Sequence, residues 1–188
     1  DMPLWKGTER IRVAGLDAAY GGDRCVFGMA EFGLDNKDNQ ILCIHPQEIV
    51  PVVVGKEEPE DQIARWVKHK CEDNHILPEN FFHDSTGRGS LGTALARHWS
   101  AACNPIEFGG KPTTRPVSLD FFIYDEETQQ RRLKLSSEHY YNFVSELWYS
   151  VAMTIQSRQF RGMTEEVMNE GCMREWGIVG ANKIEVEP

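Results

Sequence analysis

Two aspartates stand out because each closes an apolar, strand-like run at the point where a strand should be most buried. Asp17 ends "RIRVAGLD" and Asp84 ends "ENFFHD", and small residues and glycines follow both. An ionised carboxylate is costly to bury without a partner, and open sheets place their ligands at the carboxyl ends of strands. The pattern therefore favours a site for an oxygen-seeking cation at the edge of a sheet.

Magnesium suits two such carboxylates, because water and a substrate phosphate can complete its shell. Two bound ions can activate a water and stabilise the leaving oxygen when a phosphodiester is cut. The glycines of "DAAYGGD" and "DSTGRGSLG" leave space for a phosphate backbone, and Arg88 in the second stretch is a candidate contact for a phosphate. That stretch also opens a predicted helix, whose first amides can face a phosphate. The alternative, left open by the residues, is that each aspartate caps a turn or a helix.

The first half of the chain predicts the elements that position Asp17. Residues 11–17 alternate in the way of a strand, and residues 25–33 and 41–54 also have an extended pattern, with turn-forming residues between them. We expect these three segments to form an antiparallel meander. His83 adjoins Asp84 but alternates to the opposite face, which predicts packing rather than catalysis.

The pattern changes after the meander. Strands near residues 80–84 and 104–109 alternate with helices, which we place at residues 57–73, 90–100 and 138–158. This order predicts an α/β fold: an antiparallel three-strand meander followed by parallel strands in one mixed sheet, with helices on both faces.

Residues 113–136 fall outside this order and predict an extra β-hairpin about an acidic turn. Its second arm carries Arg131, Arg132 and Lys134, and Lys111 precedes it, on a chain whose net charge is −9. This local basic cluster is a hypothesis for contacts with a DNA backbone. An ordinary solvated arm is the alternative.

Composition narrows the class of protein. A length of 188 residues fits one domain, and an overall acidic charge argues against a generally basic nucleic-acid binder. Five scattered cysteines without a CxxC pair favour a reduced compartment and argue against a zinc site. We find no apolar run long enough to span a membrane and no signal peptide. Because the chain opens on Asp1 rather than methionine, we expect a piece of a longer protein.

Several stretches resemble the nuclease domain of phage large terminase subunits. "VAGLDAAYGGDRCVFGMAEFG" resembles that family's first strand and turn, and "FHDSTGRGSLGTALA" its second acidic motif. "NPIEFGGKPT", "YYNFVSELW" and "NKIEVEP" are similar to later elements, so the resemblance spans nearly the whole chain. Asn142, Ser145 and Glu146 roughly follow the family's helix motif, although Val144 stands where the family has an arginine.

The resemblance implies one ribonuclease-H-like nuclease domain over residues 1–188. It implies an endonuclease that uses Mg²⁺ or Mn²⁺ to cut concatemers of double-stranded DNA during viral genome packaging. Asp17 and Asp84 would be catalytic metal ligands, and Asp23 a weaker candidate as an outer ligand. The implied partners are the ATPase domain of the same full-length protein, the small terminase subunit and the portal protein, in the cytoplasm of the host cell.

The chain departs from that family in two ways. The family's third catalytic aspartate would lie beyond Pro188, and the absence of a GxxxxGK[ST] loop indicates that the ATPase domain is missing from this chain. Two alternatives therefore stay open. One is another ribonuclease-H-like enzyme: a resolvase, a transposase-like nuclease or an actin-like phosphotransferase, the last distinguished by ATP binding. The other is a non-catalytic docking module of the packaging motor.

Overall fold

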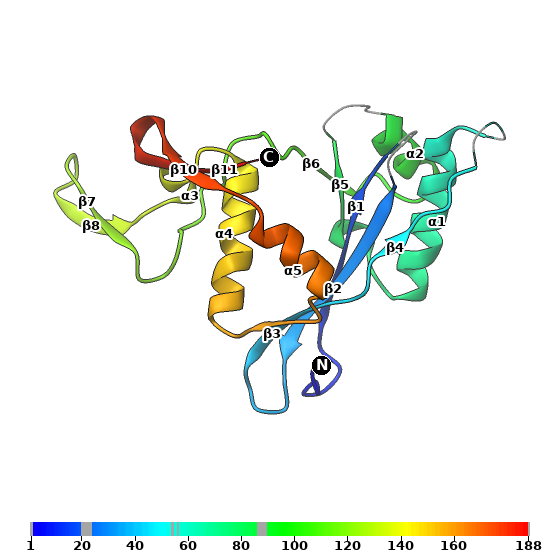
Figure 1. Ribbon diagram of the computed structural model, residues 1–188, viewed down its shortest axis with the longest axis horizontal. Helices are drawn as coiled ribbons and strands as arrows, with labels where there is room; N and C mark the ends of the chain where they lie inside the picture. The colour runs from blue at the N-terminus through cyan, green and yellow to red at the C-terminus, as the bar shows by residue number, and fades with distance from the viewer. Residues whose placement is uncertain (1, 20–23, 54, 56, 86–89, 188) are drawn as a thin grey trace. The chain divides into compact units, whose positions relative to one another are not determined.

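The protein is represented by a computed structural model that describes residues 2–19, 24–53, 55, 57–85 and 90–187 (Figure 1). Contacts between residues divide the chain into two compact units. The first unit comprises Asp1–Glu107 with Ser157–Glu165, and the second comprises Phe108–Gln156 with Glu166–Pro188. Among the described residues, no helix is long and apolar enough to cross a membrane.

The first unit is built on one mixed sheet with the strand order β6-β5-β1-β2-β3-β9, and a further strand, β4, pairs with β2. The first three strands pair antiparallel, whereas β5 and β6 run parallel to β1, so the predicted α/β fold with a mixed sheet is confirmed. The bounds are β1 Ile11–Asp17, β2 Val26–Leu34, β3 Gln40–Ile44, β4 Glu48–Ile49, β5 Phe81–Asp84, β6 Asn104–Ile106 and β9 Phe160–Arg161.

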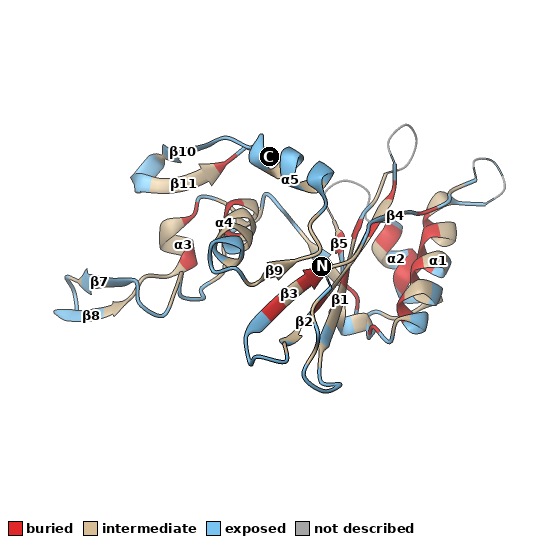
Figure 2. Ribbon diagram, turned by 60° about the horizontal axis from the view of Figure 1, so that its bottom comes forward, coloured by how far each residue is buried: buried red, intermediate tan, exposed pale blue. Residues whose placement is uncertain are grey.

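Two helices cover one face of this sheet: α1 (Pro59–Asp73) and α2 (Ser90–His98). Alternation along β1 turns Ala14 and Leu16 toward the helices, and both are at most 5% exposed. Figure 2 shows the buried residues of α1 and α2 in red. The core also contains buried apolar side chains from the neighbouring strands and both helices: Phe27, Phe81, Ile63, Ala64, Val67, Cys71, Leu91, Ala94 and Leu95. Its formation depends on the period-two and helical patterns visible in the sequence.

The second unit contains helices and two small antiparallel sheets, β7 with β8 and β10 with β11. The β7–β8 pair forms a hairpin inside residues 113–136. The bounds are β7 Phe122–Asp125, β8 Gln130–Leu133, α3 Ser136–His139, α4 Phe143–Gln156, α5 Glu165–Cys172, β10 Trp176–Val179 and β11 Lys183–Val186. Two short 3-10 turns, Pro78–Asn80 and Gly180–Asn182, complete the described elements of the chain.

The prediction of one long helix over residues 138–158 is wrong in its first part. The helix breaks at Tyr140, which is extended (φ −103°, ψ 149°) and forms a parallel bridge with Ile184. Asn142 then precedes α4, and its side-chain Oδ1 accepts hydrogen bonds from the backbone N (3.0 Å) and Oγ (2.5 Å) of Ser145. Pairing with a segment some forty positions away outweighs the helical periodicity of the local sequence.

Candidate functional site

The structure brings the two predicted aspartates to the same edge of the sheet. Strands β1 and β5 run parallel in a register that sets Gly15 beside Phe82 and Leu16 beside His83. Asp17 and Asp84 are the last residues of these strands, and extending the register by one step sets them beside each other at the carboxyl ends of both. Neighbouring strands are about 4.8 Å apart, so both carboxylates can reach a common ion or a common phosphate.

Both aspartates also share a face of the sheet. Leu16 and His83 are buried against the helices, so alternation turns Asp17 and Asp84 to the opposite face. Asp17 is exposed and Asp84 is half-buried. Within the described part of the chain, Asp17 makes no hydrogen bond or ion pair with another side chain, which leaves its oxygens open to a ligand.

His83 is a core side chain. It is 4% exposed, its ring stacks on Phe81 at a centroid distance of 6.3 Å, and its Nδ1 lies 3.1 Å from the carbonyl oxygen of Asp84. A side chain at Gly92 of α2 would begin 3.8 Å from the His83 ring, so helix and ring are closely packed. These contacts fix the backbone at Asp84 and agree with the prediction of packing.

A third carboxylate lies near this edge, and the sequence reasoning did not select it. Ser85, directly after Asp84, donates hydrogen bonds from its backbone N and its Oγ to the carbonyl oxygen of Ile106, each 2.9 Å long. Glu107 follows Ile106 and is exposed. The sequence feature that could have singled out Glu107 is its position directly after a parallel strand. Even so, no group of three or more His, Cys, Asp or Glu residues within the described ranges could hold a metal ion together.

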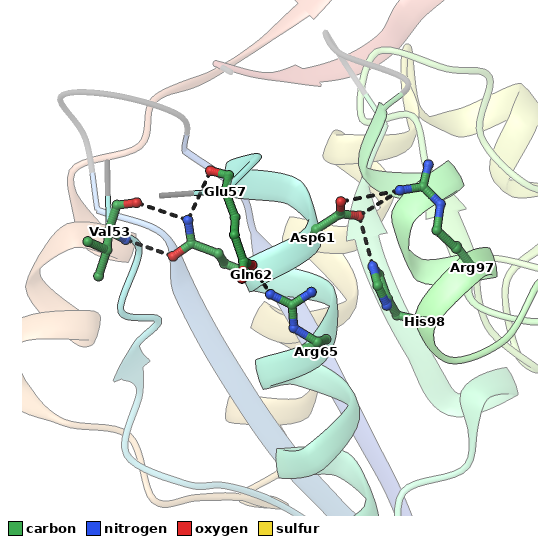
Figure 3. A network of polar contacts seen from close by, with 7 residues as sticks. All are labelled: Val53, Glu57, Asp61, Gln62, Arg65, Arg97 and His98. Carbon is green, nitrogen blue, oxygen red and sulfur yellow. Dashed lines mark hydrogen bonds and ion pairs between the residues drawn. The ribbon is translucent and has the colours of Figure 1, made fainter. Parts of the chain in front are cut away.

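The start of α1 holds both ends of α2, and Figure 3 shows the contacts of Asp61 with Arg97 and His98 at the second end. Ser90, the first residue of α2, donates from Oγ to Glu60 at 2.7 Å. At the other end, Asp61 accepts a hydrogen bond from Arg97 at 3.0 Å and lies 2.9 Å from Nε2 of His98. Asp61 at the start of one helix thus meets basic side chains in the last turn of the other, positions that the helix dipoles favour for acids and bases respectively. This network fixes the helix that follows the glycine-rich stretch after Asp84.

A side-chain amide orders the segment that leads into α1. Gln62 accepts from the backbone N of Val53 and donates to its carbonyl oxygen, at 2.9 Å each, and also donates to the carbonyl oxygen of Glu57 at 3.1 Å (Figure 3). Arg65 forms an ion pair with Glu57. These contacts support the packing of α1 and do not provide reactive groups.

Two predicted site residues, Asp23 and Arg88, lie outside the described residues. Of the four predicted DNA-binding cations in the second unit, Arg132 is held internally: its Nε lies 2.7 Å from Asp125 and its terminal nitrogens lie 2.7 and 2.5 Å from Glu138. Hydrogen bonds from Arg132 hold the pKa of Asp125 and of Glu138 at about 2. Arg132 therefore joins the hairpin to α3, and its charge is already neutralised.

The other three cations are placed differently. The guanidinium carbon of Arg131 lies 4.9 Å from the ring centre of Phe122, and Nζ of Lys134 lies 5.2 Å from that of Phe121. Lys111 is exposed. Within the described residues, none of the three forms an ion pair, so their charges are available to an anionic partner.

The motif of Asn142, Ser145 and Glu146 has a structural role in the second unit. Ser145 accepts a hydrogen bond from the backbone N of Val186 at 2.9 Å, which ties β11 to α4. Glu146 is 8% exposed and accepts from the backbone N and the Oγ of Thr113, both at 2.6 Å. These side chains hold distant segments against α4 and provide no separate reactive group.

No family model, no curated protein and no solved structure significantly matches this chain. The function is therefore inferred from the residues and their geometry.

Proposed function

We propose that this chain is a metal-dependent endonuclease of the ribonuclease-H-like class, similar to the nuclease domain of phage large terminase subunits. One observation carries the proposal: β1 and β5 pair in parallel, and their register, extended by one residue past Leu16 and His83, sets Asp17 beside Asp84 at the carboxyl edge of a mixed sheet. This edge is where open α/β sheets bind their ligands. The meander followed by parallel strands supports the fold assignment.

The residues present fit a divalent cation of the Mg²⁺ or Mn²⁺ type. Asp17 and Asp84 would provide the protein ligands, and one or two carboxylates suffice for such an ion when a substrate phosphate joins its shell. When bound, the ion would supply an activated water and neutralise charge on the cleaved phosphodiester. Asp84 would be positioned by the buried His83, and Ser85 would hold the neighbouring strand beside it.

By the same proposal, the substrate is a double-stranded DNA concatemer, cut during viral genome packaging in the cytoplasm of the host cell. The ATPase domain, the small terminase subunit and the portal protein would be its partners. The two-carboxylate edge also suits a non-catalytic docking module of the packaging motor, since no third ligand completes a cluster within the described ranges. The experiment below separates these two functions.

The test is cleavage of supercoiled plasmid with Mn²⁺, Mg²⁺ or EDTA. We expect metal-dependent nicking that falls on the order of 10²-fold or more in Asp17→Asn and in Asp84→Asn, because each substitution removes a ligand. Asp73→Asn is the matched control: this carboxylate ends α1 and, among the described residues, pairs with His69 alone, so nicking should not change.

Cleavage that survives both substitutions would refute this assignment of the site. Absence of cleavage by the wild-type chain, together with absence of Mn²⁺ binding in calorimetry, would favour the docking module.

A further inference from the structure

The β7–β8 hairpin has two chemically different faces. Its register sets Phe122 opposite Leu133 and Tyr124 opposite Arg131. Since directly opposed residues of an antiparallel pair project to the same side, these four side chains share one face, which we call the aromatic face.

The other face of the hairpin is already in use. It carries Arg132, which is held by Asp125 and Glu138. Farther along the same side, Lys134 lies over Phe121, and the Phe121 ring meets His139 of α3 edge-on at 5.4 Å. This side is therefore satisfied by contacts within the unit.

The aromatic face is exposed instead. Phe122 is 44% exposed and Tyr124 is 58% exposed, although large aromatic rings are mostly buried in folded proteins. Leu119, just before the hairpin, is 86% exposed. The guanidinium of Arg131 lies over the Phe122 ring and forms no ion pair with any described residue. Two partly exposed rings, one of them covered on one side by Arg131, thus lie beside a cation that has no ion-pair partner among the described residues.

Charge along the hairpin varies from its tip to its base. The tip carries Glu126 and Glu127, both exposed. At the base, the backbone N of Ser136 donates to the carbonyl oxygen of Arg115, whose side chain is exposed and forms no ion pair within the described part of the chain. Arg131 lies one pair from the acidic tip and Arg115 at the base, so a polyanion crossing the aromatic face would lie between them, on the base side of the tip.

We propose that the aromatic face binds an unpaired, single-stranded segment of nucleic acid. Bases would stack on Phe122 and Tyr124, and Arg131 would contact the adjoining phosphate. Stacking on exposed aromatic rings next to cations is the common way in which proteins hold single strands without reading sequence, and an arginine over a ring keeps its N–H edge free for a phosphate.

The inference rests on the proposed function only in naming DNA as the nucleic acid.

The test is fluorescence anisotropy of a labelled oligothymidylate of about 12 nucleotides with the full chain in EDTA. The double substitution Phe122→Ala with Tyr124→Ala should weaken binding by about tenfold or more, since each stacked base contributes separately. Arg131→Gln should weaken it less and lower the salt slope by about one. Tyr141→Ala is the matched control, because Tyr141 is 54% exposed in the same unit but lies off the hairpin; it should change nothing.

A second pair of substitutions separates stacking from folding. Phe122→Tyr with Tyr124→Phe keeps both ring surfaces and should bind as the wild type does. Absence of wild-type binding, or equal affinity of the wild type and the double alanine variant, would overturn the proposal. Because EDTA prevents cleavage, failure here is distinct from failure of the nuclease: plasmid cleavage without oligothymidylate binding would refute this inference alone.

Discussion

Carboxylates at the two ends of the central strands have opposite surroundings: one is buried among charged partners and the other is exposed. Glu31 belongs to β2 and lies beside the start of β1. Its side chain is 8% exposed and lies 2.9 Å from Arg12, 3.4 Å from Arg10 and 3.3 Å from His45. At the end of β1, Asp17 is exposed beside Asp84, and no described side chain pairs with it. A carboxylate that serves folding comes with its counter-charges. Within the part of the chain that the structure describes, Asp17 has none, which is the arrangement expected when the counter-charge is a ligand.

The largest expected effect on stability concerns Glu31, the carboxylate that has charged partners. Glu31→Gln should lower the free energy of unfolding by about 3 kcal/mol, because it leaves two guanidinium groups without their shared carboxylate. The measurement is urea unfolding followed by circular dichroism. Asp38→Asn is the control: its partner Lys6 and Asp38 itself are both more than half exposed, so the loss should stay below about 0.5 kcal/mol. Equal small losses in both variants would contradict the distinction between the buried cluster of Glu31 and the exposed pair of Lys6 and Asp38.

A fall in pH should weaken the ion pairs around Glu31. Burial alone would raise the pKa of Glu31, but the hydrogen bond from Arg12, the charge of Arg10 and the contact with His45 together hold that pKa below its ordinary value of 4.5. Because the folded-state pKa is the lower one, the ionised carboxylate adds stability above about pH 4.5, and this stability is lost as the pH falls through the folded-state value. The gap in unfolding free energy between wild type and Glu31→Gln should therefore narrow as the pH falls below about 4.5. A gap that widens on acidification would contradict this assignment.

Asp61 is an intermediate case. It lies in the first turn of α1 and has partners, but its side chain and that of His98 are each 23% exposed and Arg97 is 59% exposed. Asp61→Asn should therefore cost only about 1 kcal/mol. Differential scanning calorimetry measures this loss, and Arg97→Gln should show a smaller one. A cost as large as that of Glu31→Gln would show that exposure does not rank these carboxylates.

The sequence predicted the part of the fold that depends on local pattern. Alternation in β1 and the apolar face of α1 are sufficient to locate both elements, and the rule that parallel strands expose their carboxyl ends at one edge was sufficient to pair Asp17 with Asp84. The two-residue strand β9, which pairs with β3, carries too few residues to show any period. The break at Tyr140 depends on Ile184, which no local window contains.

The hairpin shows the same limit for function. Arg131, Arg132 and Lys134 are equivalent as charges in the sequence. Only the folded hairpin brings Asp125 and Glu138 to Arg132, seven and six positions away, and leaves Arg131 over Phe122. The chemistry available to a cation thus follows from its partners, as it does for Glu31 and Asp17.

The smallest expected effect on the free energy of unfolding has the opposite sign and concerns Asp17, at the carboxyl end of β1. Asp17 and Asp84 are like charges side by side on neighbouring strands, an arrangement that costs a few tenths of a kcal/mol up to about 1 kcal/mol. Asp17→Asn should therefore leave the free energy of unfolding unchanged or raise it by that amount in EDTA, while plasmid cleavage is lost. Chemical unfolding measures the stability, and added Mn²⁺ should stabilise the wild type and not the variant. The plasmid assay measures the loss of cleavage. If Asp17→Asn instead destabilised the chain as Glu31→Gln does, Asp17 would be a structural carboxylate. The proposal of a ligand site at the carboxyl edge of the sheet would then be refuted.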